Sequence, residues 1–312
     1  MSPAESSLST SLPRPQGAPL RIAFAGAGRW LATCAPPPGR TPDWTVAWFN
    51  LRPLAGESGA STDDLAAFAP QVTVLFDPAA LAPESLAALP GVTLGVLVGD
   101  LPDAAGAASI SRLHRLVSFR GELTGAPVAS TALWRAVPPP VSDLMFRPTA
   151  EVAAVSRTPL AMSIGRSTEH REAMLTPAKH HHELLHLIDG IYGQELIELM
   201  GEFDVAVHVP AEPGTGFGSQ IPLHLAAGQL LLSGDLAPAH GLERNIDYLQ
   251  IDSPEGIVWV LERLRRFPDM HRKIRIRGRL KAEQYRASFL FARLAHDLLA
   301  DVRAFGADVP VA

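Results

Sequence analysis

The sequence predicts an α/β protein with two Rossmann-like, doubly wound domains in tandem and a long C-terminal helix. Three observations predict this class. Short apolar runs alternate with helix-compatible stretches from Leu20 onward, the same alternation resumes after a proline-rich segment at 138–148, and the chain closes on a long amphipathic stretch. With 312 residues, 47% of them apolar, the chain is long enough for two medium-sized cores.

The first domain is expected over residues 20–150, after a Ser-, Pro- and Ala-rich tail at 1–19 that we expect to be disordered. Its strands are short apolar runs bounded by Gly, Pro or Asp, at 21–25, 45–50, 72–76, 93–98, 115–119 and 131–135. Ser61 before two acidic residues predicts a helix at 62–68, and Pro83 in a first turn predicts another at 83–89. This alternation is typical of an open parallel sheet.

The second domain is expected over residues 151–283, because the four prolines of segment 138–148 fit neither a helix interior nor a strand. Its strands are expected at 160–164, 203–209, 230–233 and 248–251, and its helices at 177–188, 193–200, 222–227 and 254–266. A long helix from about 280 to 305 supplies the crossing segment 284–306. Its expected buried stripe is Tyr285, Phe289, Ala292, Ala295, Leu299, Val302 and Phe305.

Charge and cysteine content restrict the class of protein. The net charge of −5 argues against nucleic-acid binding by the whole molecule, and the single Cys34 excludes an internal disulfide. The longest apolar stretch without charges, 221–234, is too short to cross a bilayer. We therefore expect a cytoplasmic protein. Nine of the nineteen residues at 263–281 are Arg or Lys, which favours a solvated helix face and leaves peripheral contact with an anionic membrane as the alternative.

Two literal motifs suggest other chemistry. Gly26 and Gly28 after the first strand resemble a dinucleotide fingerprint, but Leu31 replaces its third glycine, so NAD is not predicted. His182-Glu183-x-x-His186 would place two imidazoles one turn apart on a helix, as in zinc peptidases. The extended form with a further Gly and His is missing, and the helix belongs to a strand-helix unit. A zinc metallopeptidase is the less favoured alternative, and no metal site is predicted.

Two loops indicate an anion site. Arg166 and Arg171 follow the first strand of the second domain, where open α/β sheets bind ligands, and guanidinium groups match phosphate geometry. The glycine-rich stretch GTGFGSQIPLHLAAG at 214–228 follows a later strand and leads into a helix with Pro222 in its first turn. Its free amides would face the same cleft, with a plain glycine turn as the alternative.

The order of these features resembles the GT-B glycosyltransferases, particularly the bacterial family-1-like group with a spore-protein-type (CgeB-like) C-terminal domain. The likeness is strongest over 159–306. The segments that carry it are IGRSTEHRE at 164–172, HLAAG at 224–228, LLSG at 231–234, HGLE at 240–243, DYL at 247–249 and RGRLKAEQYRAS at 277–288. The resemblance implies that the last helix returns to the first domain. It also implies sugar transfer from a nucleotide-diphosphate donor on the second domain to an unknown acceptor on the first, without a tightly held metal or cofactor.

The resemblance also implies roles for single residues. Arg166 is the expected diphosphate contact. Arg171, Thr215, Gly216, Phe217, Gly218, Gln220, His240 and Asp247 are the further donor candidates, and His208, Glu212 and His224 are the catalytic candidates. Thr215 and Leu223 stand where many members have glutamates, and Gln220 stands where close relatives tend to have arginine. These departures make a degenerate, non-catalytic GT-B protein that binds a ligand or partner the main alternative.

Overall fold

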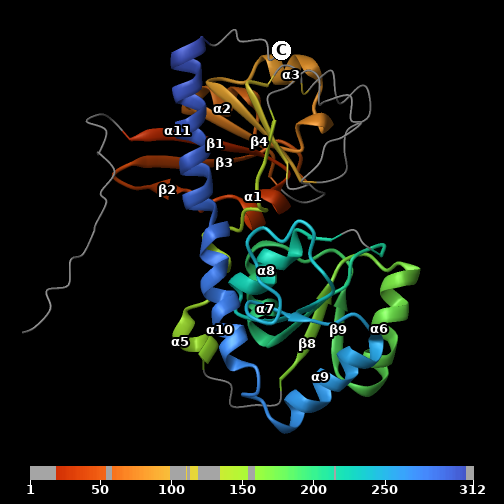
Figure 1. Cartoon of the computed structure of the whole chain (residues 1–312). Coiled ribbons are helices and arrows are strands. Elements are labelled where there is room, and N and C mark those ends of the chain that lie inside the picture. Colours follow the sequence, from red (N-terminus) through yellow and green to blue (C-terminus); the bar gives the residue numbers. More distant parts are fainter. Residues whose placement is uncertain are drawn as a thin grey trace, which may run out of the picture.

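Two parallel β-sheets, each covered by helices on both faces, form the protein (Figure 1). The computed structural model describes residues 19–53, 58–98, 110, 113–118, 134–153, 159–213 and 216–306. Most of the predicted N-terminal tail, residues 1–18, and the start of the strand predicted at 131–135 lie outside these residues. The predicted α/β class with two doubly wound sheets is confirmed.

The first sheet is centred on β1 (Leu20–Gly26). Its strand order is β2-β3-β1-β4-β5-β6-β7, and only β2 runs antiparallel to its neighbour. The other strands are β2 (Gly39–Arg40), β3 (Trp44–Asn50), β4 (Val72–Phe76), β5 (Val92–Leu97), β6 (Arg115–Ser118) and β7 (Trp134–Ala136). The central strands read as continuous apolar runs because side chains on both of their faces are buried.

Alternate side chains of β1 point into two different cores. Ile22 and Phe24 pack with α1 (Gly28–Cys34) and with the last helix, α11 (Ala287–Phe305). Ala23 and Ala25 pack on the opposite face with α2 (Thr62–Phe68) and α3 (Pro83–Ala87). The last helix of the chain therefore covers the first sheet, which confirms the predicted return of the C-terminal helix.

The second sheet has the order β12-β11-β10-β8-β9, with all strands parallel. Its strands are β8 (Ala161–Ile164), β9 (Leu184–Leu187), β10 (Val205–His208), β11 (Leu230–Ser233) and β12 (Leu249–Gln250). One face packs against α6 (Glu169–His181) and α9 (Pro254–Arg266). The other packs against α7 (Gly193–Glu202) and α8 (Gln220–Ala226).

This strand order creates a crevice between β8 and β10. The chain leaves β8 toward β9 on one side, and β10 to β12 follow on the other side. Connections at the carboxyl ends of β8 and β10 therefore diverge onto opposite faces of the sheet. Such a switch point is where open α/β sheets bind ligands.

Two connecting segments join the halves of the molecule, and these segments lie side by side. The outgoing segment contains η3 (Asp143–Met145) and α5 (Thr149–Ala153), and the returning one contains α10 (Arg272–Lys281) and η4 (Ala282–Tyr285). Val141 bridges to Arg286. The Asp143 carboxylate accepts hydrogen bonds from the backbone nitrogen of Ser288 at 3.1 Å and from its hydroxyl at 2.6 Å, and so satisfies donors at the start of α11.

The last helix differs from its prediction. The expected continuous helix over 280–305 is interrupted by η4, and α11 starts only at Ala287. This changes the helical phase, so Leu290, Phe291, Leu294 and Leu298 form the buried stripe. Phe289 and Phe305, two residues of the predicted stripe, are 64% and 74% exposed. Within the described ranges, every helix is too short or too polar to cross a membrane.

Candidate functional site

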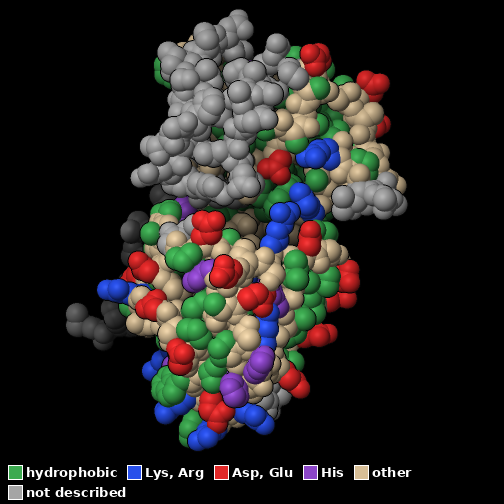
Figure 2. All heavy atoms as spheres, turned by 90° about the vertical axis from the view of Figure 1, so that its right-hand side faces the viewer, with side chains coloured by type: hydrophobic (Ala, Val, Ile, Leu, Met, Phe, Trp, Pro, Cys, Tyr) green, Lys and Arg blue, Asp and Glu red, His purple; other side chains and the backbone are tan. Residues whose placement is uncertain are grey.

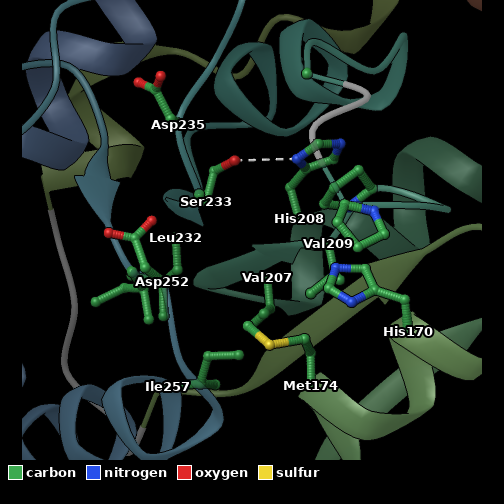
Figure 3. A pocket seen from close by; sticks show the side chains of 15 residues that line it. His170, Met174, Val207, His208, Val209, Leu232, Ser233, Asp235, Asp252 and Ile257 are labelled. Carbon is green, nitrogen blue, oxygen red and sulfur yellow. Dashed lines mark hydrogen bonds between the residues drawn. The ribbon is translucent and has the colours of Figure 1, made fainter.

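A cavity of about 230 Å³ opens at the carboxyl edge of the second sheet (Figure 3). The ends of β10 and β11 and the residues after β12 form its floor, and the first turns of α6 and α9 close it on one side. Met174, Val207, Leu232 and Ile257 give it an apolar lining. The cavity therefore lies beside the switch-point crevice, on the face covered by α6 and α9.

Polar side chains lie on opposite sides of this apolar lining. Figure 3 shows Asp252 on one side and His170 with His208 on the other. The Asp252 carboxylate accepts a hydrogen bond from Gln250 Nε2 at 3.1 Å. A hollow with an apolar floor and a few polar groups at its sides is typical of small-molecule sites, where the polar groups fix the orientation of the ligand.

His208 ends β10 and is buried beneath the loop that follows. Its Nδ1 is hydrogen-bonded to the Ser233 hydroxyl on the neighbouring strand, at 3.0 Å. Burial lowers the pKa of His208 to about 3, with smaller contributions from the positive charges of His224 and Arg171. The imidazole is therefore neutral at physiological pH, and it is a weak base.

The glycine-rich loop approaches His208 closely. Gly216 lines the cavity at φ +67°, and a Cβ there would overlap the carbonyl oxygen of Ala237. At Gly218, a Cβ would lie 2.7 Å from His208 Nε2 and 2.5 Å from Gln220 Oε1. The two glycines let this backbone lie against β10 and the loop after β11. Predicted site residue Thr215 and its neighbour Gly214 lie outside the described residues.

Arg171 is buried, and its guanidinium connects the two loops on either side of the switch point. Its Nε donates to the carbonyl oxygen of Val209 at 2.9 Å, and a second guanidinium nitrogen donates to the carbonyl oxygen of Arg166. Burial lowers the pKa of Arg171. Its guanidinium also fills the space beside Gly165, where a Cβ would come within 2.7 Å. Arg171 therefore joins the ends of β8 and β10, while Arg166 is exposed on the loop between β8 and α6.

A charged network holds this loop from the other side. His186 Nε2 is hydrogen-bonded to the carbonyl oxygen of Gly165 at 2.8 Å. Lys179 Nζ donates to Glu172 at 2.7 Å and lies 3.1 Å from His186 Nδ1. Lys179 and Ser167 lower the pKa of Glu172 to about 2 by hydrogen-bonding to its carboxylate. Because a carbonyl oxygen can only accept, His186 Nε2 is the donor to Gly165, and its Nδ1 lies beside both Lys179 Nζ and the Glu172 carboxylate, 3.3 Å from the latter.

The expected helix over 177–188 is wrong, and with it the geometry of the His-Glu-x-x-His motif. Helix α6 ends at His181, His182 is its extended C-cap, and His186 lies in β9. The two imidazoles therefore do not share a helix face. Throughout the described part of the chain, no three His, Cys, Asp or Glu side chains converge as a metal site. The motif instead supplies His186 to the network behind Gly165.

The remaining predicted site residues are spread over the second half of the molecule. His224 faces the core, 1% exposed, and hydrogen-bonds to Gln229 at 2.6 Å. Asp247 is buried and accepts from the backbone nitrogen of Glu243 at 3.0 Å. Glu212 is exposed. The structure thus brings His208 and Gly216 to the cavity itself and Gly218 to its edge, but not His224 or Asp247.

Phe217 and His240 form a second contact beside the glycine turn. Their rings meet edge to face, with centroids 4.7 Å apart. The carbonyl oxygen of His240 accepts from the Tyr285 hydroxyl at 2.9 Å and from Gln284 Nε2 at 3.0 Å. The returning segment before α11 therefore supports the loop after β11 and, through it, the glycine turn.

Sequence reasoning missed several residues at this edge. His170 and Asp252 line the cavity, and Asp189 follows β9. Asp189 accepts from the Tyr192 hydroxyl and from the nitrogen of Gly190, and these hydrogen bonds lower its pKa, with further lowering by Arg29 and Arg166. Arg29 belongs to α1 of the first half, which contacts α7 near Gly193, where a Cβ would lie 3.5 Å from the Ala32 side chain. For Asp252 the available signal was an acid just after the strand predicted at 248–251, whereas β9, which precedes Asp189, was not predicted as a strand.

The fold is similar to those of known glycosyltransferases, whereas the sequence is not similar to any family model or curated protein compared with it. Anabaena Alr3699/HepE in complex with UDP-glucose has a TM-score of 0.54 and 8% identity, over 90% of this chain and 100% of that chain. A glycosyltransferase from Rickettsia africae ESF-5 has a TM-score of 0.53 and 11% identity, over 90% of this chain and 99% of that chain.

Sucrose-phosphate synthase from Thermosynechococcus elongatus is similar to the same extent, with a TM-score of 0.52 and 10% identity over 90% of this chain and 99% of that chain. These neighbours are GT-B glycosyltransferases. At such low identity the likeness concerns the fold, and it confirms the predicted GT-B-like arrangement of two Rossmann-like sheets.

Proposed function

We propose that this chain binds a nucleotide-diphosphate sugar at the carboxyl edge of its second sheet and transfers the sugar to an acceptor held by the first half. The observation that carries the proposal is the cavity of about 230 Å³ between His208, Asp252 and the glycine turn of a GT-B fold. One structural neighbour, Anabaena Alr3699/HepE, in complex with UDP, with UDP-glucose and with UDP and glucose, supports this choice of ligand.

In this proposal the exposed side chain of Arg166 contacts the diphosphate. Arg171 acts on the same loop indirectly, because its guanidinium bonds to the carbonyl oxygens of Val209 and Arg166. The amides of Gly216 to Gly218 and the side chain of Gln220 complete the donor site. A leaving diphosphate gains negative charge as the sugar departs, so positive and N–H groups that face it favour the transition state.

The proposal assigns the donor to residues 151–283 and the acceptor to residues 20–150, with 284–306 as the crossing helix. It also keeps the spore-protein-type (CgeB-like) likeness of the C-terminal part, which rests on the sequence segments alone. Two glutamates typical of many members are replaced by Thr215 and Leu223. Asp252, at the side of the cavity, is a carboxylate that could contact a ribose instead.

A binding protein without transferase activity is the second candidate, and the burial, pKa and position of the predicted catalytic residues favour it. His208 has a pKa of about 3, His224 is in the core, and Glu212 is exposed away from the cavity lining. None of these predicted catalytic groups combines a suitable pKa with a place at the site, so general-base catalysis by them is disfavoured. Transfer in which electrostatic stabilisation is the main catalytic effect does not require such a base if the acceptor's proton passes to the departing diphosphate. The bond from the sugar to the diphosphate then breaks as the bond to the acceptor forms.

The test is a thermal-shift panel with UDP, GDP, ADP and dTDP and their sugars, because a ligand that binds only the folded chain raises its Tm. Gly234→Val checks the location. Gly234 lines the cavity and has no neighbour closer than 3.7 Å to an added Cβ, so the Cβ of valine fits there and its methyl groups add bulk at the cavity wall. Gly201→Val is the matched control, since nothing lies within 4 Å of a Cβ at that helix position.

We expect one nucleotide to stabilise the wild type and Gly201→Val, and to lose its effect on Gly234→Val. A panel without any shift would contradict the proposal, and an unchanged shift in Gly234→Val would contradict its location. Release of free sugar or its transfer to an added acceptor, followed by NMR, separates the enzyme from the binding protein. Binding without turnover would favour the second candidate.

A further inference from the structure

The part of α9 from Trp259 onward, the turn after it and the first residues of α10 carry cations and apolar side chains together on the surface. We propose that this region, the basic tip, docks on an anionic lipid surface. The basic tip comprises the cations Arg263, Arg265, Arg266, Arg272 and Lys273 and the apolar residues Trp259, Phe267 and Met270. The three apolar side chains are 54%, 58% and 40% exposed, respectively. Figure 2 shows Lys and Arg beside hydrophobic side chains at the lower end of the molecule, where Figure 1 places α9.

The structure divides the basic segment 263–281 into internal and external cations. Arg275 is buried and bonds to Asp204 at 3.2 Å, and Arg279 is buried and bonds to Glu283 at 2.8 Å. Arg277 lies 3.8 Å from the buried carboxylate of Asp247. The segment is therefore not one solvated helix face. The buried cations, Arg275 and Arg279, lie in α10, where Arg277 is exposed beside Asp247. The exposed cations of the basic tip lie at the end of α9 and the start of α10.

The exposed cations of the basic tip outnumber the acids near them. Glu262 and Asp269 are the acids within residues 259–273, and Glu262 is paired with Arg266 at 2.7 Å. The tip thus keeps a positive excess on a chain whose net charge is −5. A positive patch on an acidic protein is attracted to a negative surface locally, within about a Debye length of roughly 10 Å at moderate salt.

Apolar side chains among these cations favour lipid over other polyanions. The Arg263 guanidinium lies over the Trp259 ring, 5.0 Å from its centroid. Phe267 caps the C-terminal end of α9, and a turn places Met270 near it through a hydrogen bond from the Met270 nitrogen to the Phe267 oxygen at 3.0 Å. Exposed aromatic and Met side chains between arginines suit the boundary between headgroups and acyl chains.

The basic tip and the cavity lie at opposite edges of the second sheet, so docking through the tip is compatible with ligand binding in the cavity. Helix α9 starts beside the cavity, where Ile257 lines it, and runs to Arg266 at the opposite edge of the sheet. There Pro268 and Arg272 lie close to Asp204 and Leu230, at the beginnings of β10 and β11. A chain bound through the tip would therefore keep its cavity away from the lipid and open to water-soluble ligands.

The experiment is cosedimentation of the full chain with vesicles of phosphatidylcholine alone or mixed with phosphatidylglycerol. Arg265→Gln with Arg272→Gln tests the charges, and Phe267→Ser tests insertion. The matched controls are Arg303→Gln and Phe305→Ser, which remove the same side-chain types from exposed positions on the last turn of α11. Thermal unfolding checks that each variant is folded.

We expect binding to the mixed vesicles only, reduced by added salt and about fivefold weaker for each arginine removed. Phe267→Ser should weaken it further, and both controls should bind like the wild type. Equal binding to both vesicle types, or no effect of the tip variants, would overturn the proposal. So would failure to bind vesicles together with binding of a short RNA that Phe267→Ser leaves intact, which would indicate a nucleic-acid surface.

Discussion

The backbone of Gly218 lies directly against the imidazole of His208, because a Cβ at Gly218 would come within 2.7 Å of Nε2. His208 cannot easily give way, since its other nitrogen is hydrogen-bonded to Ser233 at 3.0 Å and its ring is buried. The glycine turn and the end of β10 therefore act as one packed unit above the cavity. A side chain between them should disturb both.

Gly218→Ala tests this packing. The added methyl group would overlap both His208 Nε2 and the end of the Gln220 side chain, so we expect a loss of about 1–3 kcal/mol in the free energy of unfolding and weaker binding of the nucleotide from the panel. Urea unfolding and titration with that nucleotide measure the two effects. The double variant Gly218→Ala, Gln220→Ala removes the flexible neighbour. Full recovery of stability in the double variant would show that His208 is not the constraint.

Removal of His186 should weaken diphosphate binding through the loop that carries Arg166. His186→Ala deletes the hydrogen bond to the Gly165 carbonyl and the acceptor beside Lys179. We expect a severalfold loss of affinity for the nucleotide diphosphate but an unchanged affinity for its nucleoside, because in the proposed complex this loop contacts the diphosphate. His186→Gln can still donate to Gly165 and should recover part of the loss.

His181→Ala, at the exposed last residue of α6, serves as the control for His186→Ala. Calorimetric titrations with the nucleotide diphosphate and with the nucleoside measure the difference. Equal weakening for both ligands would mean that His186 supports the whole sheet edge rather than the Arg166 loop.

Removal of the Asp189 charge should raise the affinity for a nucleotide diphosphate, which is the opposite of the effect expected for His186→Ala. Asp189 is an exposed carboxylate on which Arg29 and Arg166 both act, so it competes with an anionic ligand for the same positive charges. Asp189→Asn keeps the oxygen that accepts from Tyr192 and Gly190. Surface charge pairs contribute about 0.2–1 kcal/mol, so we expect affinity for a nucleotide diphosphate to rise by up to about fivefold.

Asp43→Asn removes an equal charge from an exposed position of the first half and is the control for Asp189→Asn. Both affinities are measured at low and at high salt. The increase should shrink as salt screens the arginines. Unchanged or weaker binding by Asp189→Asn would separate this carboxylate from the diphosphate site.

The sequence was sufficient for most strands of the two sheets but not for β9 or for the end of α6. The strands of both sheets appear as apolar runs because parallel strands bury both faces, and the predicted runs at 72–76 and 230–233 match β4 and β11. The run LLHL at 184–187 is equally apolar, but it follows a His-rich helix end without a Gly or Pro boundary. A short apolar run of this kind cannot be assigned to a helix or a strand by periodicity alone.

The candidate site was predictable in its location and less so in its residues. The carboxyl edge and the glycine turn follow from strand order and Gly spacing. His224 and Asp247 were misleading because buried polar side chains also serve internal hydrogen bonds, here with Gln229 and the Glu243 backbone. The network of Glu172, Lys179 and His186 joins a helix to a strand through tertiary contacts, which spacing along the sequence does not reveal.

Cys34 should be unreactive in the folded chain. It is buried in the core between the first sheet and α11, and burial raises the pKa of its thiol to about 12. The thiolate is the reactive form, so a thiol reagent should modify the protein at the rate of unfolding and rapidly in denaturant. Because the chain has one cysteine, the absorbance of the released reagent reports this site alone. Rapid stoichiometric labelling without denaturant would contradict its burial.

Acidification should destabilise the fold before its carboxylates titrate. Burial lowers the pKa of His224 from 6.5 to about 4 and that of His208 from 6.5 to about 3. Below pH 6.5 the unfolded chain therefore takes up protons that the folded chain does not, and the stability present above pH 6.5 is lost as the pH falls. Each histidine contributes a slope of up to about 1.4 kcal/mol per pH unit in this window.

His224→Gln should reduce this slope, because glutamine can hydrogen-bond to Gln229 but does not titrate. Urea unfolding between pH 6.5 and about 5 measures it, and carboxylates whose pKa is lowered, such as Glu172, stay ionised in both states over most of that window. His181→Gln, at an exposed position, should leave the slope unchanged. If the wild type and His224→Gln lose stability equally on acidification, His224 is not held neutral in the core.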